Sequence, residues 1–177
     1  MRACMKYLKE HVKESLLVAE IGVHCGSNAA EMLHELQNIR ELYLIDPYVA
    51  YVDRDSSCPQ WYIYDSHTVD LYQKAAEANI ALQPEGNKAK FIRLPSLEAV
   101  QLFPEQIFDF VYIDAMHSRP HVDNDIRVWY PKIRIGGMLG GHDWGVQDVK
   151  DAVNLFAKEM NIKLQEELFE TDWFIIK

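Results

Sequence analysis

Acidic and histidine side chains follow several apolar runs that we expect to form strands, and these side chains could do chemistry. They are Glu20, Asp46, Asp114, His117, His142 and Asp143. In an open sheet of parallel strands, the carboxyl ends meet at one edge, where ligands bind. His117 and His142 are candidate general bases, because an imidazole with a pKa of about 6.5 can accept a hydroxyl proton near neutral pH. Each histidine could instead have a purely structural role.

Glu20 belongs to the segment Leu16–Gln37, which reads as a buried strand, a glycine turn and an amphipathic helix. Gly22 and Gly26 bracket the turn, where close backbone approach or a positive φ is expected. Ser27 is placed to cap the helix. The turn lacks the second glycine of the dinucleotide fingerprint and the Gly-Lys-Ser/Thr of a phosphate-binding loop. An acid just before the first glycine suits a cationic ligand better than a pyrophosphate.

The second expected strand, Glu41–Asp46, ends in an acid that lies twenty residues past Gly26. At this position a carboxylate can accept hydrogen bonds from the ribose hydroxyls of a nucleotide. The alternative is an ordinary turn at the end of the strand, because Asp-Pro commonly opens turns.

The stretch Tyr48–His67 is too long for an ordinary connection between a strand and a helix, which has about 2–6 residues. It is rich in aromatic side chains, namely Tyr48, Tyr51, Trp61, Tyr62 and Tyr64. Aromatic residues in a long loop beside a ligand site predict a lid over the substrate. The alternative is a loop that packs on its own domain or on a second subunit, since aromatic residues are also enriched at interfaces.

Helices and strands alternate through the rest of the chain. We expect helices at 3–14, Thr68–Leu82 and Val146–Met160, a helix opened near Pro120, and a short helix capped by Ser96. Further strands are expected at Ala89–Leu94, Ile107–Asp114 and within Ile135–Trp144. Lys163–Phe169 and Asp172–Lys177 should pair as an antiparallel hairpin, because Glu170 and Thr171 make a tight connection. The predicted fold is α/β: a doubly wound, Rossmann-like sheet of seven mostly parallel strands, with helices on both faces.

The length and composition of the chain suit one domain spanning 1–177, with 48–67 as an aromatic-rich insertion. The formal net charge of −9 argues against nucleic acid or an anionic membrane as the main partner. The three cysteines are scattered, which favours reduced thiols in the cytoplasm. The charged N-terminus is unlike a signal peptide, and no apolar run is long enough for a membrane span. The sequence leaves open whether the chain forms a homo-oligomer.

The turn sequence EIGVHCGSN and the acid of ELYLID resemble motif I and the second-strand acid of the class I S-adenosylmethionine-dependent methyltransferases. The segment FDFVYIDAMHS…IRIGGMLGGHDW is similar to the Methyltransf_24 type of small enzymes in that class, and the resemblance spans roughly Leu16–Lys177. It implies that the methionine part of the cofactor lies against Glu20 and the Gly22–Gly26 turn. Asp46 would hold the ribose, Ser96 would lie near the adenine, and Asp114 would lie near the sulfonium and the substrate.

The catechol-type O-methyltransferases, which share this fold, place metal-binding acids at the two strand ends that carry Asp114 and Asp143. The resemblance therefore implies a metal site formed by Asp114, His142 and Asp143. Hard oxygen ligands suit Mg²⁺, and an added histidine permits Mn²⁺. The other possibility for the same residues is a metal-free histidine base that an acid orients.

From this resemblance we expect an S-adenosylmethionine-dependent methyltransferase that acts on an oxygen atom of a small hydroxylated metabolite or a sugar. Asp114, His117 and His142 are the expected catalytic residues. Two alternatives stay open: a domain that binds the cofactor without catalysis, because a fold does not fix a function, and a nicotinamide-dependent oxidoreductase. The missing glycine and the expected terminal hairpin speak against the oxidoreductase.

Overall fold

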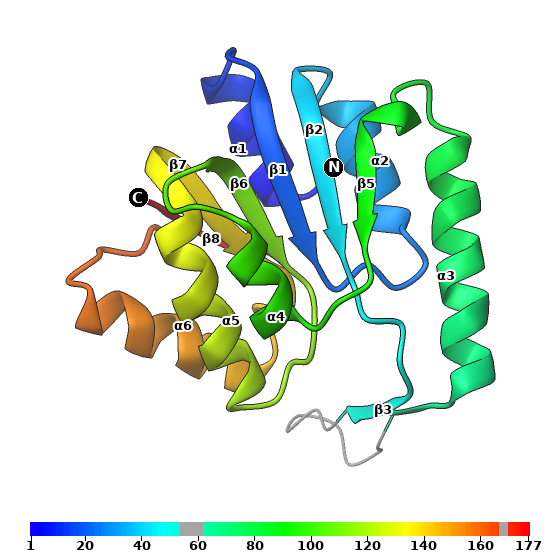
Figure 1. Cartoon of the computed structure of the whole chain (residues 1–177). Helices are drawn as coiled ribbons and strands as arrows, with labels where there is room; N and C mark the ends of the chain where they lie inside the picture. Colours follow the sequence, from blue (N-terminus) through cyan, green and yellow to red (C-terminus); the bar gives the residue numbers. More distant parts are fainter. Residues whose placement is uncertain (54–61, 167–169) are drawn as a thin grey trace.

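The computed structural model describes residues 1–53, 62–166 and 170–177. Its main sheet has six strands in the order β5-β2-β1-β6-β7-β8 (Figure 1). In chain order they are β1 Leu16–Ile21, β2 Ile39–Ile45, β5 Ala89–Ile92, β6 Phe108–Ile113, β7 Ile133–Gly141 and β8 Trp173–Ile176. Neighbouring strands are parallel, except that β8 runs antiparallel to β7.

Helices cover both faces of the sheet (Figure 1). One face carries α1 Ala3–His11, α2 Ser27–Glu35 and α3 Ser66–Ala81, and the other carries α4 Ser96–Ala99, α5 His121–Trp129 and α6 Gln147–Glu159. Side chains of a strand alternate between its faces, so each sheet strand serves two cores. In β1, Leu16 and Val18 pack toward the first set of helices, whereas Leu17 and Ala19 pack toward the second. This arrangement confirms the predicted doubly wound α/β fold.

The predicted C-terminal hairpin is wrong in its first strand. Residues 163–166 form no strand, and 167–169 lie outside the described residues. Ile162 and Leu164 pack instead against the core beneath α5 and α6. The last strand is antiparallel as predicted, but it pairs with β7, so that Gly141 lies opposite Trp173 and Met138 opposite Ile176. The main sheet thus has six strands in the described part of the chain, where seven were predicted.

The stretch 48–67, predicted to be irregular, contains a small antiparallel pair. Strand β3, Tyr51–Asp53, pairs with β4, Tyr62–Tyr64, so that Tyr51 lies opposite Tyr64. Residues 54–61, which include Trp61, lie outside the described residues. Asp65 then caps α3, because its side chain accepts a hydrogen bond from the N–H of Thr68.

Two predicted helix caps are wrong. Gly26 occupies the cap position of α2, and the Ser27 hydroxyl lies 3.2 Å from the Cys25 thiol instead. Pro95 occupies the cap position of α4, and the Ser96 side chain turns toward α5. The first helix also ends three residues earlier than predicted, at His11. Among the described helices, none is both long and apolar enough to cross a membrane.

Candidate active site

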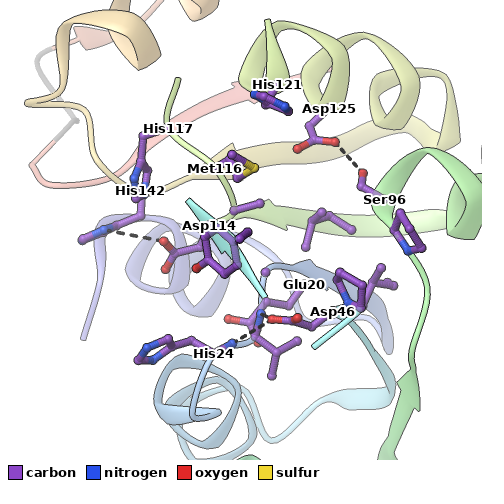
Figure 2. A pocket seen from close by; sticks show the side chains of 18 of the residues that line it. Glu20, His24, Asp46, Ser96, Asp114, Met116, His117, His121, Asp125 and His142 are labelled. Atoms are coloured by element: carbon purple, nitrogen blue, oxygen red, sulfur yellow. Dashed lines mark hydrogen bonds and ion pairs between the residues drawn. The ribbon is translucent and has the colours of Figure 1, made fainter. Parts of the chain in front are cut away.

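A pocket of about 740 Å³ opens at the carboxyl ends of the parallel strands. Its walls include nine of the ten residues that the sequence singled out: Glu20, Gly22, Ser27, Asp46, Ser96, Asp114, His117, His142 and Asp143. The tenth, Gly26, packs against α3, where an added Cβ would lie 3.1 Å from the Ala76 side chain. The parallel sheet therefore brings the predicted residues to one cavity, and Figure 2 shows several of them facing each other across it.

The turn after β1 depends on glycine at two positions. Gly22 has a φ of 85°, and a Cβ there would lie 2.2 Å from the carbonyl oxygen of Asp114. Without a side chain, the turn can press against the end of β6. Gly26 has a φ of 74°. Both glycines thus adopt the left-handed backbone expected of them.

The Asp46 carboxylate stabilises this turn from the neighbouring strand. Its Oδ2 accepts hydrogen bonds from the backbone N–H groups of Val23 (3.0 Å) and His24 (3.1 Å), and its Oδ1 accepts one from Tyr48 (2.8 Å). A carboxylate has about four acceptor positions. Three backbone bonds therefore leave room for a ligand hydroxyl on the pocket side.

Glu20 is 1% exposed and still lines the pocket. Its Oε1 accepts a hydrogen bond from Asn28 Nδ2 (2.7 Å), while Oε2 has no hydrogen-bond partner among the described residues. Burial raises the pKa of Glu20 to about 8, and the hydrogen bond from Asn28 offsets only part of that effect. An unsatisfied buried carboxyl oxygen at the wall of a cavity fits a cationic hydrogen-bond donor such as an ammonium group.

A polar cluster lies across the ends of β6 and β7. The strand ends are held together by backbone hydrogen bonds, including His142 N–H to the Ile113 carbonyl (3.0 Å). Asp143 Oδ2 lies 2.7 Å from His117 Nε2 and 3.1 Å from His142 Nδ1. His142 Nδ1 also lies 3.9 Å from Asp114 Oδ1. One carboxylate thus orients both histidines, which is the arrangement of an acid-oriented base.

The same cluster contains a possible set of metal ligands. Candidate ligand atoms of Asp114, His117 and Asp143 all lie within 4.8 Å of one another. Two carboxylates and an imidazole fit a divalent cation such as Mn²⁺ or Mg²⁺. The compact set contains His117, whereas the sequence placed His142 with the two acids.

The charges of the cluster shift its pKa values in opposite directions. Burial raises the pKa of Asp114, with partial compensation from His142 and Arg2. Burial also disfavours the charged form of Asp143, but the hydrogen bonds from both histidines outweigh it and hold the pKa of Asp143 well below its usual range. The hydrogen bond to Asp143 raises the pKa of His142.

One pocket residue, Arg2, could not be selected from the sequence. Its Nη1 donates to the Tyr112 hydroxyl (2.6 Å) and lies 3.7 Å from both Asp114 and Asp172. Tyr112 in turn donates to Asp172, which is fully buried (2.9 Å). These partners are 110 or more positions from Arg2 along the chain, so only the folded chain reveals that a guanidinium is fixed beside Asp114.

Ser96 lines the opposite part of the pocket and joins two helices there. Its hydroxyl donates to Asp125 Oδ1 (2.5 Å) and accepts a hydrogen bond from Trp129 Nε1 (2.9 Å). Burial raises the pKa of Asp125 to about 6. Asp125 also lines the pocket, although no sequence pattern marks it.

The β3–β4 pair contributes aromatic side chains to the mouth of the pocket. Tyr51 and Tyr64 line the pocket, and their rings stack with centroids 4.6 Å apart. The His24 ring of the β1 turn lies 6.2 Å from Tyr64 and 3.8 Å from Tyr72 of α3. The small strand pair therefore contacts the turn that carries the predicted cofactor residues.

Comparison with known proteins places these features in context. A family model described as a methyltransferase domain matches residues 19–144, from β1 to just past β7. No individually curated protein matches the chain. Among solved structures, the chain is similar to the O-methyltransferase NovP, with 15% sequence identity and a TM-score of 0.62 over 99% of this chain and 79% of that chain.

Two other solved structures show how widely this fold is used. A precorrin-6y C5,15-methyltransferase from Geobacter metallireducens GS-15 has 12% identity and a TM-score of 0.60, over 89% of this chain and 68% of that chain. Spermidine synthase from Thermotoga maritima has 16% identity and a TM-score of 0.56, over 82% of this chain and 45% of that chain. At such low identities, the likeness shows the fold alone.

Proposed function

The chain belongs to the methyltransferase domain family, whose model matches residues 19–144 of its 177, and we propose that it transfers the methyl group of S-adenosylmethionine to an oxygen atom of a small hydroxylated molecule. The observation that carries this proposal is the buried Glu20 oxygen beside the Gly22 turn, which has no hydrogen-bond partner in the described part of the chain, with Asp46 in the same pocket. Such a site suits a ligand with a cationic amino acid end and a ribose.

Each end of the proposed cofactor has a partner in this chain. Glu20 would accept a hydrogen bond from the methionine ammonium, and the ammonium would in turn stabilise the ionised carboxylate. The acceptor position left on Asp46 would hold a ribose hydroxyl. Bound S-adenosylmethionine supplies a methyl group on a positively charged sulfur. Asp114 lies between these groups and the histidine cluster, where a negative charge favours the sulfonium.

The histidine cluster would handle the proton of the acceptor. As the new O–C bond forms and the C–S bond breaks, the hydroxyl proton passes to an imidazole nitrogen of His117 or His142. Asp143 Oδ2 lies 2.7 Å from His117 Nε2 and 3.1 Å from His142 Nδ1, so its negative charge would stabilise the imidazolium that forms. Because the reaction is an in-line displacement, fixed positions should supply much of the rate.

As the alternative to a metal-free histidine base, we propose a divalent metal ion at the cluster. Asp114, His117 and Asp143 would hold it, and His142 is the neighbouring histidine that remains. A metal of this kind lowers the proton affinity of a bound hydroxyl and holds the hydroxyl in place. Mg²⁺ and Mn²⁺ are the candidates, because two of the three donors are carboxylates.

The acceptor class is proposed from the charge of the chain. The net charge of −9 disfavours nucleic acid as a partner, so a small metabolite or a sugar is preferred.

The two described cysteines, Cys4 and Cys25, are free thiols, which suits the cytoplasm. Self-association would add a second wall to the pocket if the stretch 48–67 were an interface.

Isothermal titration calorimetry against S-adenosylhomocysteine and NAD tests the cofactor class. We expect binding of S-adenosylhomocysteine and none of NAD. Turnover with S-adenosylmethionine across a panel of hydroxylated metabolites then separates an enzyme from a domain that only binds the cofactor. Binding of NAD alone would contradict the proposal, and cofactor binding without turnover on any acceptor would favour the non-catalytic alternative.

A further inference from the structure

Arg2 lines the pocket but has no part in the mechanism above. Among the described residues that form the pocket walls it is the one lysine or arginine, whereas six carry carboxyl groups: Glu20, Asp46, Glu98, Asp114, Asp125 and Asp143. An anionic group on a ligand would be repelled along most of these walls. A guanidinium at one place in an acidic pocket therefore marks where such a group could be held.

The guanidinium is fixed through one of its nitrogen atoms. Arg2 Nη1 donates to the Tyr112 hydroxyl (2.6 Å) and lies 3.7 Å from the fully buried Asp172. Asp172 has two further donors, the Tyr112 hydroxyl (2.9 Å) and the backbone N–H of Cys4 (3.3 Å). This network ties Arg2 to β6, to β8 and to the start of α1, so its position does not depend on a ligand.

The rest of the guanidinium keeps its capacity to bind. The recorded polar contacts of the Arg2 side chain in the described part of the chain all use Nη1. A guanidinium has five N–H donors, and the edge formed by Nε and Nη2 matches the two oxygens of a carboxylate. The side chain is 24% exposed at the wall of the pocket. The donors that remain are therefore available to a ligand.

Arg2 also lies beside the histidine cluster. Its Nη1 is 3.7 Å from Asp114 Oδ2, and His142 Nδ1 is 3.9 Å from Oδ1 of the same carboxylate (Figure 2). The guanidinium and an imidazole thus flank one side chain. A small molecule can therefore place a hydroxyl group at the histidine cluster and a carboxylate at Arg2.

We propose that Arg2 binds a carboxylate of the methyl acceptor, so that the acceptor is a hydroxy acid. This inference rests on the proposed function, because it assumes that the acceptor hydroxyl is methylated at the histidine cluster. Arg2 is then a specificity residue, since a carboxylate held by its guanidinium directs the hydroxyl of the same molecule to His117 or His142. The methionine carboxylate of the cofactor is the other carboxylate that could reach Arg2, and the experiment separates the two.

The probes are acids paired with their neutral amides. The three isomers of hydroxybenzoate place the hydroxyl at three distances from the carboxylate, and each is compared with the matching hydroxybenzamide. Lactate and lactamide form an aliphatic pair. Calorimetry on the wild type saturated with S-adenosylhomocysteine measures the affinity for each probe. We expect at least one acid to bind about tenfold or more tightly than its amide, because the amide carries no charge to pair with the guanidinium.

Three variants assign this preference to one side chain. Arg2→Gln should lower the affinity for the acid to that of the amide and change the affinity for S-adenosylhomocysteine by no more than about twofold. Arg2→Lys keeps a positive charge beside Asp172, so it should stay folded, but it lacks the planar fork and should lose about threefold or more of the preference. Lys6→Gln is the matched control, because it removes the same charge from α1 outside the pocket lining, where Lys6 pairs with Glu170. It should keep the full preference.

Several results would overturn the proposal and leave the proposed function intact. They are the lack of any acid that the wild type prefers to its amide, a preference that persists unchanged in Arg2→Gln or Arg2→Lys, and a tenfold loss of S-adenosylhomocysteine affinity in Arg2→Gln. The last result would assign Arg2 to the methionine carboxylate of the cofactor instead. Failure of the folded wild type to bind S-adenosylhomocysteine would overturn both the inference and the proposed function.

Discussion

At the scale of single residues, Asp46 serves two purposes that one substitution can separate. Its carboxylate accepts three backbone hydrogen bonds, so Asp46→Ala should lower the free energy of unfolding by about 1–3 kcal/mol. Loss of the ribose contact should also weaken S-adenosylhomocysteine binding by about 1.5–3 kcal/mol. Urea titration and calorimetry measure the two effects.

Asp46→Asn is the comparison variant, because it keeps one acceptor oxygen and the shape of the side chain. It should recover part of the lost stability. If Asp46→Ala remains folded and binds the cofactor product as tightly as the wild type, Asp46 does not hold the ribose.

Glu20 should make stability depend on pH in an unusual direction. Its pKa of about 8 in the folded state exceeds the unfolded value of about 4.3. The folded state therefore holds this proton more tightly, and the contribution of Glu20 is full below about pH 4 and is lost as the pH rises through 8. Glu20→Gln cannot titrate, and its amide oxygen can still accept the hydrogen bond from Asn28.

Urea unfolding at pH 5, 6, 7 and 8 measures this difference. Between pH 5 and pH 8, the wild type should lose on the order of 3 kcal/mol of stability relative to Glu20→Gln. Glu10→Gln, at an exposed position on α1, should follow the wild-type profile. Parallel profiles for Glu20→Gln and the wild type would show that Glu20 is ionised in the folded protein.

Residue spacing predicted the acidic rim because parallel strands deliver their ends to one edge. Gly22 and Asp46 could be identified in this way, since each lies at the end of a strand that the sequence marks clearly. Arg2 and Asp125 could not, because their roles depend on partners from other elements, such as Tyr112 and Ser96. The two serine caps were wrong because each hydroxyl has another partner: Ser96 donates to Asp125 of α5, whereas the Ser27 hydroxyl lies beside the Cys25 thiol, two residues earlier in the chain.

At the scale of elements, the β3–β4 pair is the segment best placed to respond to ligands. An isolated pair of strands is only marginally stable. Its Tyr51 and Tyr64 line the pocket, while Val52 and Ile63 face each other across the pair and are exposed to solvent. One face of the pair therefore looks into the site and the other looks outward, as expected of a lid over the substrate.

If this pair is a lid, backbone amides of Tyr51–Asp53 and Tyr62–Tyr64 should exchange hydrogen more slowly when cofactor product and acceptor are both bound. Hydrogen exchange with mass spectrometry detects the change. Tyr51→Ala should reduce the added protection, whereas Ile63→Ser, on the outward face, should keep it. Equal exchange in the free and bound protein would favour static packing or a subunit interface.

Elements with a strong apolar pattern were predicted well, and the end of the chain was not. The strands β1 and β6 are mostly apolar and buried on both faces, so their composition marks them. The segment 163–169 alternates weakly, and its Leu164 is satisfied by packing against the core instead of by strand pairing. The last strand finds its partner in β7, a contact over more than thirty residues that local patterns do not specify.

At the scale of the whole molecule, the sheet has a core on each face and brings one polar cluster together at the ends of β6 and β7. Asp114, His117, His142 and Asp143 come from two segments of the chain that the fold places side by side. They can form either a divalent metal site or a metal-free pair of histidines oriented by Asp143. Arg2 adds a positive charge 3.7 Å from Asp114, which opposes a metal ion but does not remove the other ligands.

Chelation distinguishes the two mechanisms. We expect exhaustive treatment with EDTA to abolish turnover, because a metal held by Asp114, His117 and Asp143 would lower the proton affinity of the acceptor hydroxyl. Binding of S-adenosylhomocysteine should persist, since Glu20 and Asp46 hold it independently of the cluster, and added Mg²⁺ or Mn²⁺ should restore turnover.

Asp143→Asn should lower the metal affinity, measured by calorimetry, by about tenfold or more, since it replaces a charged ligand. Full activity after chelation would reject the metal. A rate that then rises with pH through a histidine pKa would indicate a histidine base. The base would be the histidine whose substitution, His117→Gln or His142→Gln, removes this rise.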